Sequence, residues 1–222
     1  MFFTEGGNKI HFHINKKDKD MEIAVMEKVY TAEEYLFTER NTRREDAGKY
    51  QFYKNKRIFM AGATRKHDRI ESNLHLALGI RIGDNENYEL HTSNMRIQSF
   101  SKNKEYFYSD GLIVKGKPEF ADHYLDILTN PTLIIEVLSK STQRFDRNGK
   151  FESYRNLDSF EEYILVAQNE PCVEHFYKNN KGEWIEAAKL KSLDDVLILE
   201  NLPFQVPLSK IYQRVNFEEV EE

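Results

Sequence analysis

The carboxylate with the most unusual setting in this sequence is that of Glu136. It lies in NPTLIIEVLSKST, Asn130 to Thr142, where five of the seven residues from Thr132 to Leu138 are large and aliphatic. Such a run is typical of a strand buried on both faces. A buried ionised carboxylate without a partner is very costly, so we expect Glu136 to be paired, protonated or bound to a metal ion.

A second carboxylate, Asp110, begins another short aliphatic strand, in YSDGLIVKG. Side chains alternate along a strand, so Glu136 shares a face with Ile134 and Leu138, near the carboxyl end where open α/β sheets commonly place sites. If the two strands are neighbours, the carboxylates can approach each other, and like charges in an apolar setting favour a divalent cation. The pattern equally allows a structural interpretation, in which Glu136 caps a loop or pairs with Lys or Arg.

The composition fits one soluble domain. The chain has 222 residues, of which 40% are hydrophobic and 31% are charged. No segment approaches the run of about 18 apolar residues that indicates a membrane span, and the opening MFFTEGGNKIHFHINKKDKD lacks the pattern of a signal peptide. One cysteine, Cys172, excludes an internal disulfide framework and a thiolate metal site, and a reducing cytoplasm is the expected location.

The net charge of −5 gives no global basic signature of the kind seen in many nucleic-acid-binding proteins. A local groove can still be basic on an acidic protein. Basic residues cluster in RNTRR, KNKR and RKHDR, the last running from Arg65 to Arg69. Taken singly, each cluster is interpreted as a solvated face.

The elements that must position Asp110 and Glu136 alternate between strands and helices. Those expected before Asp110 are a helix from a capping box at Thr31 and Glu34 through Glu39, two strands within Gly48 to Ala61, an amphipathic helix from Thr64 to about Gly79 and a strand from Thr92 to Phe100. Those expected after Glu136 are a helix from an Asp146 N-cap through Asn156, a strand in EEYILVAQ, a hairpin around Asn180–Gly182, and a last strand with an extended tail in DDVLILENLPFQVPL. This order predicts an α/β single domain with a mixed central β-sheet flanked by helices.

Several motifs together resemble a known family. They are HTSNMRI, YSDGLIV, NPTLIIEVLS, FDRNGKFESYRNL, which contains the spacing D-x-x-x-K-x-x-x-Y, and EEYILVAQNEPCVEHF. They closely resemble the Uma-two family of restriction endonucleases, within the PD-(D/E)XK nuclease superfamily. The similarity runs from YTAEEY to PLSKIY. It implies a restriction-endonuclease-like domain at residues 30–215, an N-terminal extension at 1–29 and an acidic tail at 216–222.

The resemblance also implies an activity and a site. The expected activity is Mg²⁺-dependent hydrolysis of DNA phosphodiester bonds, with Mn²⁺ able to replace Mg²⁺. Asp110 and Glu136 would be the metal-binding carboxylates, and the backbone carbonyl of Val137 would complete the site. Mg²⁺ held there could orient and deprotonate water and stabilise the charge that develops on the phosphate.

The sequence departs from the superfamily pattern at two positions. Ser109 replaces the proline before the first acid, and Leu138 replaces the lysine of the E-x-K triplet. The expected catalytic lysine is therefore Lys150, one turn into the next helix, with Tyr154 on the same face at i+4. The alternative is an ordinary surface lysine beside a packed tyrosine. Lesser candidates lie on the intervening loop: Lys140, Gln143 and Arg144.

Other residues are accessory candidates. His67 is either a packing residue on the apolar face of its helix or a ligand or base, whereas Glu71 lies off that face and is expected to be solvated. Gln51 stands where members of the resembled family often carry Glu. Tyr106 and Tyr108, next to Asp110, are more simply explained by core packing than by stacking on bases.

A second class of function stays open. The missing E-x-K lysine and the acidic net charge are also compatible with a catalytically inactive module that keeps the nuclease fold and acts in nucleic-acid binding or protein assembly. For the nuclease, DNA is the expected partner and no membrane is involved. A homodimer is expected because two sites related by a two-fold axis cut both strands most simply.

Overall fold

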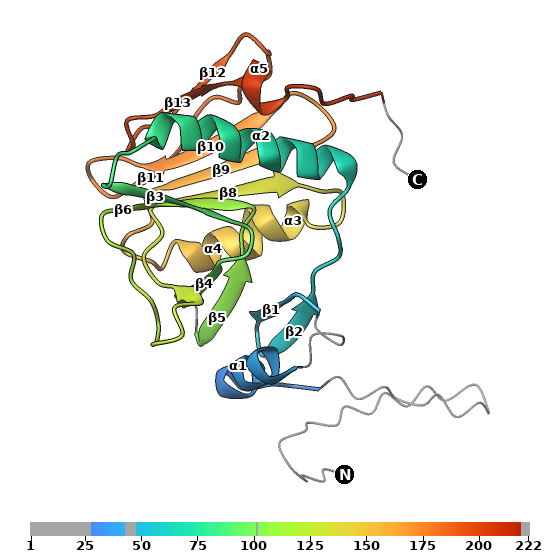
Figure 1. Ribbon diagram of the computed structural model, residues 1–222, viewed down its shortest axis with the longest axis vertical. Helices are drawn as coiled ribbons and strands as arrows, with labels where there is room; N and C mark the ends of the chain where they lie inside the picture. Colours follow the sequence, from blue (N-terminus) through green and yellow to red (C-terminus); the bar gives the residue numbers. More distant parts are fainter. Residues whose placement is uncertain (1–27, 43–47, 101, 219–222) are drawn as a thin grey trace, which may run out of the picture. The chain divides into compact units, whose positions relative to one another are not determined.

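The structure is a computed structural model that describes residues 28–42, 48–100 and 102–218 (Figure 1). Most of the expected N-terminal extension and most of the acidic tail lie outside these ranges. The contacts divide the chain into two compact units, one that ends at Met60 and one that begins at Ala61. The domain boundaries at 29/30 and 215/216 stay predictions.

The described residues of the first unit form one helix and one hairpin. Helix α1 (Ala32–Asn41) begins with the predicted capping box, in which Thr31 Oγ1 accepts from Glu34 N at 3.1 Å and Glu34 Oε2 accepts from Thr31 N at 2.8 Å. It extends two residues beyond the predicted end. Strands β1 (Tyr50–Tyr53) and β2 (Lys56–Phe59) pair antiparallel. Their turn residues Lys54 and Asn55 have φ of 49° and 64°, as a tight two-residue hairpin requires.

The second unit is built on a six-stranded sheet in the order β11-β10-β9-β8-β6-β3. Its strands are β3 (Tyr88–Thr92), β6 (Gly111–Lys115), β8 (Leu133–Leu138), β9 (Glu162–Ala167), β10 (Val173–Lys178) and β11 (Trp184–Glu186). Strands β8 and β9 are parallel and the other neighbours are antiparallel. The predicted mixed α/β fold is confirmed, and the strands that carry Asp110 and Glu136 are neighbours.

The remaining strands differ most from expectation. In the second unit, β4 (Arg96–Phe100) pairs antiparallel with β5 (Lys104–Tyr108) and parallel with β7 (Ile127–Leu128). Strand β5 was not predicted, because its charged start resembles a turn. The last segment is a hairpin of β12 (Val196–Ile198) and β13 (Gln205–Pro207), followed by α5 (Leu208–Ile211), in place of one strand and a tail. Tyr106 and Tyr108 are buried, which confirms core packing for both.

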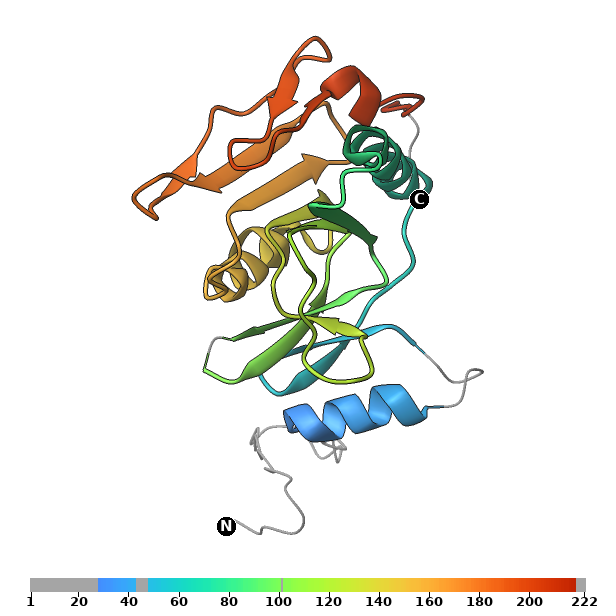
Figure 2. The same cartoon turned by 60° about the vertical axis from the view of Figure 1, so that its left-hand side comes forward.

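Helix α2 (Arg65–Ile82) covers one face of the sheet (Figure 2). The Thr64 side chain accepts from His67 N at its start, and Gly83, with φ of 50°, ends it four residues after the predicted Gly79. Its stripe of Ile70, Leu74, Ala77 and Leu78 packs in one buried cluster with alternate β8 residues, Leu133, Ile135 and Val137. In the described part of the chain no helix has the length and apolar character that a membrane crossing requires.

The opposite face of the sheet is covered by a continuous helical segment. It consists of α3 (Gln143–Phe145), one wide π-helical turn η2 (Asp146–Lys150) and α4 (Phe151–Tyr154). The predicted N-cap at Asp146 is wrong, because the segment begins three residues earlier and Asp146 lies inside it. Since side chains alternate on β8, Glu136 faces this segment while Val137 faces α2.

Candidate metal-dependent active site

Asp110 is fixed to the strand that carries Glu136. Its backbone N–H donates to Ile135 O at 3.1 Å, and its Oδ2 accepts from Val137 N at 2.6 Å, so it bonds to the residues on both sides of Glu136. The regular β6–β8 pairing ends at Gly111 and Ile135, which leaves room for this side-chain bond. The second carboxylate oxygen, Oδ1, accepts no hydrogen bond from the described residues. Asp110 therefore keeps one oxygen open for a ligand.

A glycine allows the close approach of α2 to this strand end. A Cβ at Gly111 would come within 3.0 Å of His75 Nε2, which is tighter than ordinary packing allows. With no side chain at Gly111, α2 comes near enough for His67 Nε2 to lie 3.3 Å from Asp110 Oδ2. Burial would lower the pKa of His67, but Asp110, Glu71 and Asp146 outweigh it and raise that pKa.

Glu136 is buried, as its sequence context predicted, and both of its oxygens have partners. Lys150 Nζ lies 2.9 Å from Oε2, and the Tyr154 hydroxyl donates to Oε1 at 3.3 Å. Burial raises the pKa of Glu136 well above its usual range, and the charges of Asp146 and Asp110 add to this while Lys150 opposes it. Asp110 and Glu136 are thus close enough to interact electrostatically, as expected of two carboxylates in one site.

Lys150 is held by two hydrogen bonds and one further ion-pair contact. Its ammonium lies 2.9 Å from Glu136 Oε2, 3.1 Å from Asp146 Oδ1 and 3.2 Å from the Tyr108 carbonyl oxygen. Burial would lower the pKa of Lys150, but the carboxylates of Glu136, Asp146 and Asp110 outweigh it and raise that pKa, so the ammonium stays charged. The structure therefore brings Lys150 to Glu136 rather than to solvent, and the surface-lysine alternative is wrong.

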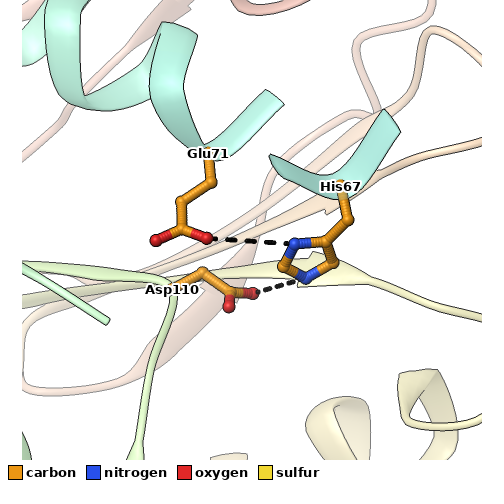
Figure 3. Close-up of side chains that lie close together, drawn as sticks. All are labelled: His67, Glu71 and Asp110. Atoms are coloured by element: carbon orange, nitrogen blue, oxygen red, sulfur yellow. Dashed lines mark ion pairs between the residues drawn. The ribbon is translucent and has the colours of Figure 1, made fainter. Parts of the chain in front are cut away.

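A second set of donor atoms meets at Asp110. His67, Glu71 and Asp110 each offer one atom, and these atoms lie within 4.8 Å of one another (Figure 3). Glu71 Oε2 is 3.9 Å from His67 Nδ1, too far for a hydrogen bond, and Nδ1 is buried without a hydrogen-bond partner. The expectation that Glu71 is merely solvated is wrong, because its carboxylate points toward the His67 ring.

Two residues of the site were missed as site residues in the sequence. Asp146 was assigned to a helix cap, yet its buried carboxylate faces Lys150 one helical turn away, an i, i+4 spacing that the sequence does display. Tyr163 donates its hydroxyl to Asp146 O at 2.9 Å and so supports that turn, a contact between distant segments that no local pattern indicates.

The other candidates lie as follows. Tyr154 is fully buried and packs edge-on against Phe107, with ring centroids 5.4 Å apart, which orients its hydroxyl toward Glu136. Gln51 belongs to β1 of the first unit, whereas the contacts described above are all within the second unit. Of the loop candidates, Gln143 accepts from Arg147, and Lys140 and Arg144 are exposed.

The donor set fits a hard divalent cation. Asp110 and Glu136 supply carboxylate oxygens and Val137 a backbone carbonyl, the ligand types that Mg²⁺ and Mn²⁺ accept. The N–H and C=O of one strand residue point to the same side, so the Val137 carbonyl faces the strand edge where Val137 N bonds Asp110. Asp110 Oδ1 accepts no hydrogen bond from the described residues, and the Glu136 oxygens keep lone pairs beside their present bonds.

Comparison with known proteins places the chain in a family. The family model of Uma2, described as "Putative restriction endonuclease", matches residues 32–209. The chain belongs to the Uma2 family. Two curated relatives, both named as uncharacterized proteins of Synechocystis sp., are 36% identical over 165 residues and 26% identical over 185 residues. These alignments cover 74% and 83% of this chain and 90% and 92% of the relatives.

A solved structure supports the same fold. The crystal structure of a protein from Anabaena variabilis, named as a "putative nuclease", superposes with a TM-score of 0.64 over 82% of this chain and 97% of its own. Its sequence identity to this Uma2 protein is 14%, so the likeness establishes the architecture alone. The resemblance expected from the sequence motifs is confirmed at the level of family and fold.

Proposed function

We propose that this Uma2 protein is a metal-dependent endonuclease that hydrolyses DNA phosphodiester bonds. Family membership supports the reaction class. The observation that carries the proposal is the buried Lys150–Glu136 ion pair next to Asp110. It supplies, from a helix, the ammonium that Leu138 cannot provide, so two acids and one lysine of a nuclease site are present together.

Each residue has a distinct proposed role. Asp110, Glu136 and the Val137 carbonyl hold Mg²⁺, which when bound supplies Lewis-acid stabilisation of the phosphate and lowers the pKa of water. Lys150 orients the attacking water and balances negative charge on the phosphate, because it stays protonated between its carboxylate partners. Tyr154 holds the Glu136 carboxylate in place through its hydroxyl.

His67 is proposed to orient the first acid. Its Nε2 contacts Asp110 Oδ2, the oxygen that also accepts from Val137 N, so Oδ1 is left for the cation. The His67 interaction lowers the pKa of Asp110 against the effect of burial, which keeps that carboxylate ionised. An ionised, oriented carboxylate is what cation binding requires.

Cation uptake by three variants tests the site. Titration calorimetry with Mn²⁺ at pH 7 should show one binding event in the wild-type protein that is lost in Asp110→Asn and Glu136→Gln. Glu71→Gln should keep it, because the proposed set does not include Glu71. Loss of uptake in Glu71→Gln with retention in Glu136→Gln would move the cation to His67, Glu71 and Asp110 and overturn the proposed ligand set.

Cleavage assays test the reaction itself. Wild-type protein should nick or linearise plasmid DNA with Mg²⁺ and stop when EDTA is added. Glu136→Gln should be inactive although it folds, as judged by its circular dichroism and unfolding midpoint. Equal cleavage by wild type and Glu136→Gln would show that the activity comes from another site. Sedimentation analysis with and without duplex DNA tests the homodimer that we propose for two-strand cutting.

One observation favours a second candidate function. Both oxygens of Glu136 have protein partners and the Lys150 and Glu136 side chains are only 4% and 3% exposed, so the ion pair is complete without a cation. A structural pair of this kind fits an inactive module that binds nucleic acid or assembles with proteins. That candidate requires the absence of Mn²⁺ uptake and of cleavage in the wild-type protein.

A further inference from the structure

Four cationic side chains from two distant segments line one small hollow in the second unit. Arg65, Lys66 and Arg69 come from the first turns of α2, and Arg214 comes from the chain after α5. This hollow, which we call the basic hollow, contains the segment RKHDR that the sequence alone indicated to be a solvated face. The grouping concentrates positive charge on a chain whose net charge is −5.

Side-chain hydrogen bonds fix the second segment against α2 and against Cys172. The Asn73 side-chain amide donates to Ile211 O at 2.9 Å and to Gln213 O at 2.8 Å. Tyr212 is tied to Cys172 in both directions, since its hydroxyl donates to Cys172 O at 2.8 Å and accepts from Cys172 N at 3.0 Å. The backbone just before Arg214 is therefore held in place, and the meeting of the four cations is a property of the fold.

Lys66 is the residue that points to a ligand. It is 5% exposed, yet it forms no hydrogen bond or ion pair with any residue that the structure describes, although its side chain lines the hollow. The other buried lysine of this unit, Lys150, has two hydrogen-bond acceptors and a further ion pair with Asp146. The ammonium of Lys66 reaches the solvent of the hollow, where an anion would supply the counter-charge that the described residues do not provide.

Two of the three arginines that line the hollow also lack an ion-pair partner among the described residues. Arg69 and Arg214 are exposed, and neither forms an ion pair with the described residues. Arg214 also has φ of 63°, a left-handed conformation that a glycine adopts without steric cost. The backbone alone would thus favour glycine at this position.

We propose that the basic hollow binds a phosphate group of the nucleic-acid strand, with Lys66, Arg69 and Arg214 as its contacts. The inference rests on the proposed function and names the part of the surface that holds the substrate. Lys66 directly precedes His67, whose ring contacts Asp110, so a strand that reaches Asp110 passes the first turn of α2. The partial positive charge of a helix N-terminus favours a phosphate at that turn.

DNA binding in the absence of metal tests the proposal. The full-length protein in EDTA is titrated against a fluorescent duplex, and the anisotropy is followed at several KCl concentrations. Arg69→Ala, Arg214→Gly and Lys66→Met should each weaken binding by about three- to tenfold and reduce the slope of log K against log salt by about 0.9 per lost phosphate contact. Lys181→Ala, which removes an exposed charge from the β10–β11 turn, should change neither value.

Arg214→Gly separates binding from folding. Glycine suits the left-handed backbone at this position, so the unfolding temperature of Arg214→Gly should equal or exceed that of the wild type while the DNA affinity of this variant falls. Arg214→Lys should keep most of the wild-type affinity. Unchanged affinity and salt slope in all three hollow variants would overturn the inference. The inference would also be overturned if the protein takes up inorganic phosphate in a way that requires Lys66 while the three variants leave DNA binding unchanged. The hollow would then be a free-phosphate site.

The inference and the proposed function fail in different ways. If the wild type does not cleave DNA but the hollow variants still lose affinity in EDTA, the nuclease proposal fails and the phosphate contact stands. If the wild type cleaves with Mg²⁺ and the variants bind and cleave as it does, the endonuclease stands and the phosphate contact fails.

Discussion

Lys150 Nζ lies 2.9 Å from Glu136 Oε2, and the two residues come from a π-helical turn and from the neighbouring buried strand. Leu138, two positions after Glu136 on the same strand, stands where the E-x-K triplet would carry its lysine. The ammonium thus reaches the Glu136 carboxylate from a helical turn and not from the strand itself. A wide π-helical turn at this point fits the tendency of such turns to occur at functional sites.

Removing Lys150 should destabilise the protein strongly. Lys150→Met leaves the Glu136 carboxylate buried without its counter-charge, and breaking one partner of a buried pair costs about 3–5 kcal/mol. Urea unfolding at pH 7 measures the loss. The double variant Glu136→Gln, Lys150→Met should lose less than Lys150→Met alone, because no uncompensated charge remains. A double variant that is less stable than Lys150→Met would contradict this account of the pair.

A lysine on the strand should replace the lysine on the helix. Lys150→Met should lower the rate of Mg²⁺-dependent DNA cleavage by about 100-fold or more. Adding Leu138→Lys to that variant should recover about tenfold, because Leu138 and Glu136 share a face of β8 and the new ammonium can reach the same carboxylate. As a control, Leu138→Met in the Lys150→Met background should recover nothing. Failure of the strand lysine, in a protein that still folds, would mean that Lys150 acts through its own position and not through its charge.

Much of this fold could be predicted from local pattern. The capping box at Thr31, the stripe of α2 and the apolar run of β8 each depend on neighbours within a few residues, and all three elements form as predicted. Strand β5 was not predicted because its charged start resembles a turn, although its aromatic residues are buried. Its assignment as a strand depends on the residues that pack against it, and the local sequence does not contain that information.

The candidate site divides in the same way. Glu136 could be singled out because a carboxylate in an aliphatic run is costly, and Asp110 because it begins another aliphatic strand. Lys150 was proposed from the resemblance to the family, whose pattern places a lysine and a tyrosine on the following helix. The pairing of Asp146 with Lys150 and the approach of Glu71 to His67 required the helices to be placed against the sheet. A carboxylate side chain on a helix can contact any of several partners, and only the tertiary structure determines which one it contacts.

Asp146 should act as a positioning residue for Lys150. Its buried Oδ1 lies 3.1 Å from Lys150 Nζ, so Asp146→Asn keeps the shape and removes a charge that holds the ammonium. We expect kcat for DNA cleavage to fall by about tenfold or more while KM and Mn²⁺ affinity change little, because the groups proposed to bind DNA and the cation remain. Asp146→Glu should recover part of kcat. A change in KM alone, or loss of Mn²⁺ uptake, would argue against a positioning role.

Glu174 should contribute stability that is lost in acid. Its Oε1 accepts from Arg147 Nη2 at 2.7 Å and Nε at 3.2 Å, and its Oε2 lies 3.3 Å from Lys189 Nζ. Burial would raise the pKa of Glu174, but Arg147 and Lys189 outweigh it and lower that pKa below its usual range. Because the folded carboxyl has the lower pKa, its contribution is fully present above the unfolded pKa of about 4.3 and is lost as the pH falls through the folded value.

The acid sensitivity of the Glu174 contacts can be measured by substitution. Glu174→Gln should lower the free energy of unfolding by about 1–2 kcal/mol at pH 7. The difference from the wild type should stay constant down to about pH 5 and shrink below about pH 4, because the wild-type carboxyl is then protonated as well. Urea unfolding across this pH range measures the difference, and Glu186→Gln on the adjacent strand, an exposed position, serves as the control. If the free energy of unfolding of the wild type minus that of Glu174→Gln instead increases as the pH falls, the ionised carboxylate destabilises the fold. Arg147 and Lys189 would then not compensate the burial of Glu174.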